Sequence, residues 1–135
     1  MQHLDATPVK ARKAVYHEGL RFAAVGVVNT TVSFIIILSA KPWIGILAAN
    51  ALGYACGIAI SFLLNRRWTF GHTGGTRAAI IGFSIVTAVA FVSNLVVISS
   101  FQRAGFTYLV AQLAGSFSYT AISFVGLKFG VFRKS

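Results

Sequence analysis

The sequence is poor in charged residues and above all in acidic ones. Only two of its 135 residues are Asp or Glu, twelve are Lys or Arg, and charged residues make up 10% of the chain. Neither acid, Asp5 or Glu18, lies inside a long apolar run. A small proton-coupled drug exporter needs a carboxylate inside the membrane to exchange protons for cations, so the sequence argues against that class of transporter.

Cysteine, metal ligands and catalytic groups are also scarce. Cys56 is the only cysteine, which rules out an intrachain disulfide, and its place in mid-run is typical of a small packing residue. The three histidines, His3, His17 and His72, lie far apart, without the spacing of metal ligands. The sequence shows no nucleophile–base pair, metal cluster or glycine-rich phosphate loop, so we expect neither an enzyme nor a cofactor.

Apolar residues dominate what is present, at 56% of the chain. Crossing a bilayer as a helix takes about 20 mostly apolar residues. Four continuous runs of that kind cover roughly 20–40, 44–64, 79–101 and 108–127, and they lack the alternation of barrel strands. The sequence therefore predicts an all-α membrane protein with four transmembrane helices. The first run is too long for the apolar part of a signal peptide, so we expect no cleavable signal.

The positive charges gather on one side of the four predicted helices. That side would hold Lys10, Arg12, Lys13, Arg21, Arg66, Arg67, Arg77, Lys128, Arg133 and Lys134, and the other side Lys41 and Arg103. The positive-inside rule then places both termini in the cytoplasm. We expect a basic cytoplasmic tail over residues 1–15 and a membrane domain over residues 16–135. The chain leaves no room for an exposed basic domain, so we expect no nucleic-acid partner.

Residues 61–70 recur in altered form as residues 123–132. The first stretch reads Ser-Phe-Leu-Leu-Asn-Arg-Arg-Trp-Thr-Phe and the second Ser-Phe-Val-Gly-Leu-Lys-Phe-Gly-Val-Phe, which aligns Arg66 with Lys128. The pattern predicts two helical-hairpin repeats, about 20–70 and 77–132, joined by the glycine-rich residues 71–76. Because both copies would begin and end on the same side of the membrane, the repeats would be parallel.

The second apolar run carries a small residue at every fourth position, namely Ala49, Gly53, Gly57 and Ser61. Such a stripe permits close approach by the backbone of another helix. Between the first two runs, Pro42 is expected to stop the helix and Trp43 to lie in the interfacial aromatic belt.

The chain resembles the GtrA-like family of small bacterial membrane proteins from about residue 20 to residue 132. The most specific match is the string Asn-Arg-Arg-Trp-Thr-Phe at 65–70; the others are Arg21, Phe22, Gly26, Asn29, Asn50, Ser61, Phe62, Val131 and Phe132. The family often has asparagine and arginine where this chain has Leu127 and Lys128. The resemblance implies flipping of a polyprenyl-phosphate-linked sugar, with undecaprenyl phosphate as carrier, across the bacterial inner membrane. The product would serve synthesis or modification of cell-surface polysaccharide.

Seven residues are candidates for contact with such a lipid: Arg21, Asn29, Asn50, Asn65, Arg66, Arg67 and Lys128. The cations would receive the phosphate, and arginine offers a planar fork of donors that suits it. Unpaired amides are costly in lipid, so Asn29 and Asn50 should each face a partner or a polar cavity that could hold a sugar. The alternatives are that the cations only orient the protein and contact lipid phosphates, and that the amides only join helices.

A second interpretation of the resemblance is a membrane subunit that recruits or stabilises a glycosyltransferase without moving lipid. Its interface would be the small-residue stripe of the second helix. The same stripe is a candidate interface for a homodimer, because four short helices leave little interior for a large headgroup. Membrane lipids are expected partners under either interpretation.

Overall fold

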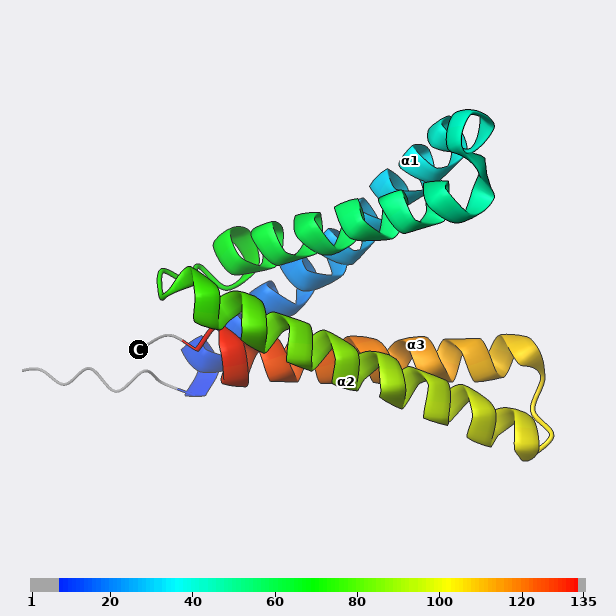
Figure 1. The fold of residues 1–135 in the computed structure, drawn as a ribbon. Helices are drawn as coiled ribbons and strands as arrows, with labels where there is room; N and C mark the ends of the chain where they lie inside the picture. The colour runs from blue at the N-terminus through cyan, green and yellow to red at the C-terminus, as the bar shows by residue number, and fades with distance from the viewer. Residues whose placement is uncertain (1–7, 134–135) are drawn as a thin grey trace, which may run out of the picture. The chain divides into compact units, whose positions relative to one another are not determined.

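The fold was obtained as a computed structural model, which describes residues 8–133. Helix α1 covers Pro8–Leu64 and continues into a π-helical turn, η1, at Asn65–Thr69. Helices α2 and α3 cover Thr76–Arg103 and Tyr108–Val125, and a second π-helical turn, η2, covers Gly126–Val131. The chain divides into two compact units between Gly71 and His72 (Figure 1). Each unit is a helical hairpin and is described by itself.

Helix α1 folds back on itself, which gives the first unit its hairpin shape (Figure 1). A straight helix of its 57 residues would be about 85 Å long, far more than the roughly 30 Å of a hydrocarbon core. The break lies at Gly45, whose φ of 78° and ψ of 166° are accessible to glycine and strained for other residues. The prediction that Pro42 stops the helix is wrong, because α1 runs through that proline. We call residues 8–44 the first arm and residues 46–64 the second arm.

The two arms pack through the glycines of the small-residue stripe. A Cβ on Gly53 would lie 2.5 Å from Ile37 Cγ1, and one on Gly57 would lie 2.5 Å from Ser33 Oγ and 2.6 Å from Asn29 Oδ1. The Ser33 hydroxyl also donates a hydrogen bond to the Gly53 carbonyl at 3.1 Å. The stripe is therefore covered by the first arm of its own hairpin, so the predicted homodimer or partner interface on these glycines does not match this packing.

The second unit packs in the same manner. A Cβ on Gly115 in α3 would lie 2.6 Å from Ile98 Cγ1 and 2.9 Å from Asn94 Nδ2, both in α2. Ile98 thus takes the place that Ile37 has opposite Gly53. The hydroxyls of Ser93 and Ser118 lie 2.7 Å apart and form a hydrogen bond between α2 and α3. The two hairpins share a glycine-against-isoleucine contact near the middle of their lengths.

In the second unit, a turn with a glycine joins α2 to α3, and a threonine caps the start of α3. Gly105, at φ 87°, lies between the two helices. Thr107 then caps α3, because its hydroxyl accepts a hydrogen bond from the Val110 amide at 3.4 Å. Threonine is a favoured residue at this place, since its oxygen satisfies an amide that has no partner within the helix.

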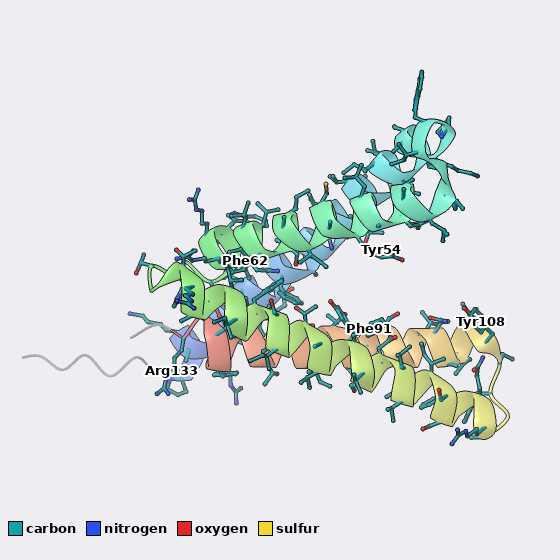
Figure 2. The ribbon with its side chains drawn as sticks, in the orientation of Figure 1. Tyr54, Phe62, Phe91, Tyr108 and Arg133 are labelled. Carbon is teal, nitrogen blue, oxygen red and sulfur yellow. The ribbon has the colours of Figure 1, made fainter. Side chains whose placement is uncertain are left out.

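Most large apolar side chains in both units are exposed. Leu47 is 84% exposed and Phe117 77%, and Tyr54, Phe91 and Tyr108 also stand off their helices (Figure 2). Three helices of the described chain are long and apolar enough to cross a membrane: Pro8–Thr69, Thr76–Arg103 and Tyr108–Val131. The first of them contains two of the four predicted runs. An apolar exterior of this kind is stable in lipid and costly in water.

Candidate functional site at the π-helical ends of the hairpins

The second arm of α1 ends in the π-helical turn η1. Its closing hydrogen bond runs from the Phe70 amide to the Asn65 carbonyl, five residues earlier, at 2.9 Å. Phe70 is only 2% exposed, and its ring lies 6.3 Å from the ring of Phe22 in the first arm. Burial of this ring against the first arm accompanies the wider turn. Such turns are uncommon and occur often at functional sites.

A ladder of three polar side chains runs along the inside of this end. The Asn65 amide donates from Nδ2 to the Ser61 hydroxyl at 3.1 Å, and the Thr69 hydroxyl donates to Asn65 Oδ1 at 3.1 Å. Asn65 and Thr69 are 2% and 3% exposed. Both atoms of the Asn65 amide group are therefore engaged within the hairpin. The spacing of four residues in Ser61, Asn65 and Thr69 places the three on one face.

Arg21 ties the first arm to the same turn. Its guanidinium donates to the main-chain carbonyl of Trp68 at 3.1 Å and lies 5.7 Å from the centre of the Trp68 ring. The last carbonyls of a helix lack partners within the helix, so a cation at this place satisfies one of them. Arg21 also stacks on the indole, which adds a cation–π attraction.

Two further cations follow Asn65 directly. The Arg66 guanidinium lies 5.8 Å from the centre of the Phe62 ring, one turn earlier in α1 and labelled in Figure 2. Arg66 is half-buried, and Arg67 is exposed. This end of the first hairpin carries Arg21, Arg66 and Arg67, with the single acid Glu18 one turn before Arg21 in the first arm. The surplus of positive charge suits an anionic ligand.

The second hairpin ends in the same backbone form. The Phe132 amide donates to the Leu127 carbonyl at 2.7 Å, which closes η2, and both residues are almost fully buried. Lys128 Nζ lies 5.9 Å from the centre of the Phe124 ring, as Arg66 lies over Phe62 in the first hairpin. The Phe132 ring is covered by His72 at 5.4 Å.

The interiors of the two turns differ in chemistry. Leu127 stands where the first hairpin has Asn65, and Val131 stands where it has Thr69. The second turn is therefore lined by apolar side chains and carries one lysine, while the first is lined by a hydrogen-bonded ladder and carries two arginines.

The two asparagines farther along the first hairpin, Asn29 and Asn50, lie apart from this end and from each other. Asn29 Oδ1 is buried beside Gly57 and accepts no hydrogen bond from any residue between 8 and 133. Asn50 donates from Nδ2 to the Ile46 carbonyl of its own helix at 2.7 Å. At 1.5 Å per residue, Asn50 lies roughly 10 Å along the second arm from the place opposite Asn29. The Asn50 amide thus pairs with the backbone of its own helix.

The structure thus places the seven predicted residues in three groups. Arg21, Asn65, Arg66 and Arg67 share the end of the first hairpin, Lys128 occupies the equivalent end of the second, and Asn29 and Asn50 lie within the first hairpin. Sequence reasoning missed Ser61 and Thr69 as partners of Asn65, although their spacing is visible in the sequence. Within residues 8–133, no group of three or more His, Cys, Asp or Glu side chains is placed to hold a metal ion.

Comparison with known proteins agrees with this picture. The family model described as GtrA/DPMS, transmembrane domain, matches residues 21–132, which begin at Arg21 and end at Phe132. A relative from Bacillus subtilis (strain 168), described as the uncharacterized membrane protein YngA, is 30% identical over 117 residues. That match covers 85% of this chain and 79% of the relative. The predicted resemblance is confirmed, and the chain is a membrane protein that belongs to the GtrA/DPMS transmembrane-domain family.

Proposed function

We propose that the protein moves a polyprenyl-phosphate-linked sugar from the cytoplasmic to the outer leaflet of the bacterial inner membrane, for cell-surface polysaccharide. The observation that carries the proposal is that three arginines, Arg21, Arg66 and Arg67, lie at the π-helical end of the first hairpin. Family membership supports a role with lipid-linked sugars. A phosphate at the membrane surface is the anion that such a group would receive.

The proposed topology has four crossings. Each arm of α1 crosses once, and α2 and α3 cross once each, so the turns at Gly45 and Gly105 lie outside. The cations at the two π-helical ends then face the cytoplasm, in line with the positive-inside rule. The two hairpins form parallel repeats, and the protein is multi-pass in the inner membrane.

In this mechanism the candidate residues take separate parts. Arg21, Arg66, Arg67 and Lys128 attract the phosphate at the cytoplasmic surface. Asn29 offers a buried amide oxygen without a partner in the described chain, which is the kind of group that accepts from a sugar hydroxyl. Asn50 and Asn65 complete the polar groups of the hairpin. The prenyl chain stays in lipid along the exposed apolar side chains, and consumption of the product outside draws the movement forward.

The test uses purified protein in liposomes that contain a polyprenyl-phosphate sugar with a labelled headgroup. Headgroup accessibility is followed across the bilayer for the wild type, Arg66→Ala and Asn29→Ala. Arg103→Ala is the matched control. It also removes an arginine, but this arginine ends α2 beside the turn at Gly105 and is not part of either π-helical turn. We expect protein-dependent movement that falls in the first two variants and persists in the control.

The same experiment separates the second interpretation, a subunit that recruits a glycosyltransferase. Movement no faster than in empty liposomes, for several headgroups, would favour that role. Such a subunit would bind its partner through the exposed apolar faces, since Gly53 and Gly57 are covered by the first arm.

A further inference from the structure

The polar ladder in the first hairpin needs an explanation beyond folding. The second hairpin forms the same π-helical turn with Leu127 and Val131 in place of Asn65 and Thr69. Apolar side chains are therefore sufficient for this backbone. Burying an amide and a hydroxyl costs free energy that their hydrogen bonds only offset, so the polar pair brings no obvious gain in stability.

Directional hydrogen bonds do supply a fixed geometry. Leucine and valine can slide against their neighbours, whereas a satisfied hydrogen-bond network selects one arrangement. The ladder runs from Ser61 in the α-helical part to Thr69 at the end of η1, so it spans the change from α to π geometry. Arg66 and Arg67 lie between Asn65 and Thr69 in the chain, so a backbone fixed by the Asn65–Thr69 hydrogen bond also fixes where these two arginines begin.

The cations on the two turns match this difference. An arginine binds phosphate through a planar fork, which requires orientation, whereas a lysine acts as a point charge on a flexible stem. The turn with the ladder carries Arg66 and Arg67, and the turn without it carries Lys128.

We propose that Asn65 and Thr69 are positioning residues, whose buried hydrogen bond fixes η1 so that Arg66 and Arg67 present their guanidinium groups to a lipid-linked phosphate. The first hairpin is then the one that orients the phosphate, and Asn65 acts without touching it. This inference rests on the proposed function and reassigns Asn65 from ligand contact to support.

The test transfers the interior of the second turn into the first. Thr69→Val, Asn65→Leu and the double variant keep all arginines and install side chains that η2 already accommodates. The control is the reverse transfer, Leu127→Asn with Val131→Thr. Binding of a radiolabelled short-chain isoprenyl monophosphate to protein in nanodiscs is measured, with the matching isoprenyl alcohol as a probe that lacks phosphate.

We expect each of the three first-turn variants to bind the phosphate probe about tenfold more weakly. The double variant should be no worse than either single one, because two residues of one hydrogen bond act as a unit. Alcohol binding and the reverse transfer should show no change. If Thr69→Val bound the phosphate probe with wild-type affinity while Asn65→Leu bound it more weakly, the proposal would be overturned, because Asn65 would then touch the ligand itself. Unchanged affinity in all three would overturn it as well.

A second readout separates this inference from the proposed function. Hydrogen exchange of the Phe70 amide reports the closing bond of η1 without any ligand. Faster exchange in Thr69→Val, together with a wild type that ignores the phosphate probe, would uphold the ordering of the turn and overturn its role toward phosphate. Unchanged exchange in Thr69→Val would overturn the positioning role itself, whatever the wild type binds.

Discussion

Arg21 donates a hydrogen bond to the carbonyl of Trp68, 47 residues later in the chain, at 3.1 Å. This bond joins the start of the first apolar run to the π-helical turn that follows the second run. It closes the open end of the hairpin, while the glycine contacts of Gly53 and Gly57 hold its middle. One residue thus serves both the fold of the first unit and the positive charge of its end.

Replacement of Arg21 by lysine should separate its hydrogen bond to Trp68 from its positive charge. Arg21→Lys keeps the charge but loses the planar group that donates to Trp68 while lying over its ring. We expect a loss of about 1 kcal/mol in unfolding free energy, as for a typical partly exposed hydrogen bond. Thermal unfolding in one detergent measures it, with Arg77→Lys at the exposed start of α2 as control. Equal stability of both variants would contradict a structural part for Arg21.

Gly57 should not tolerate a methyl group. A Cβ there would lie 2.5 Å from Ser33 Oγ and 2.6 Å from Asn29 Oδ1, so these side chains or the two arms would have to shift. Gly57→Ala should lower the unfolding free energy by about 1–3 kcal/mol, the usual effect of overpacking.

The control for this prediction is Gly26→Ala in the same helix. A Cβ on Gly26 would meet no atom within 4 Å in the part of the chain that the structure describes. Alanine favours helix over glycine, so this variant should match or slightly exceed the wild type in thermal unfolding. A Gly57→Ala variant as stable as Gly26→Ala would show that the arms do not meet at Gly57.

The stability of the turn in α1 should depend on the glycine at position 45 and should not depend on the proline at position 42. Gly45→Ala forces a Cβ into a backbone region that is almost confined to glycine, at a cost of about 1–3 kcal/mol. Pro42→Ala restores an amide within a helix and should cause no loss. Thermal unfolding compares the two, and greater damage from Pro42→Ala would place the turn at the proline instead.

The sequence was sufficient for the class of fold and for the family. Long apolar runs and their bordering cations predicted a helical membrane protein, and the string at 65–70 predicted the GtrA-like resemblance, which the family match confirms. The stripe of small residues predicted close helix contact, because glycine spacing is a local signal. It did not identify the helix that approaches, since that depends on where the chain turns.

Other features depend on contacts far apart in sequence. The π-helical turns come with the burial of Phe70 and Phe132, and helix propensity contains no information on either ring's surroundings. The break at Gly45 was missed because proline is the stronger local signal for a helix end, yet α1 runs through Pro42. The Arg21–Trp68 bond joins residues that no spacing rule would pair.

The number of crossings is open to direct measurement, because the chain has a single cysteine. In a Cys56→Ser background, single cysteines are introduced at Trp43, Thr73 and Arg103, all of which are exposed. A membrane-impermeant maleimide is then applied to cells whose inner membrane is directly accessible to the reagent, once with the cells intact and once after lysis.

In the proposed topology, the turns near Trp43 and Arg103 lie outside and the linker with Thr73 lies inside. We expect the cysteines at 43 and 103 to react in intact cells and the cysteine at 73 only after lysis. If α1 instead dipped into the membrane and returned without reaching the outer surface, the cysteine at 43 would stay unreactive while that at 103 reacted. Reaction at 73 in intact cells would invert the topology and move Arg66 and Arg67 away from the cytoplasmic leaflet, where a lipid-linked sugar made in the cytoplasm first arrives.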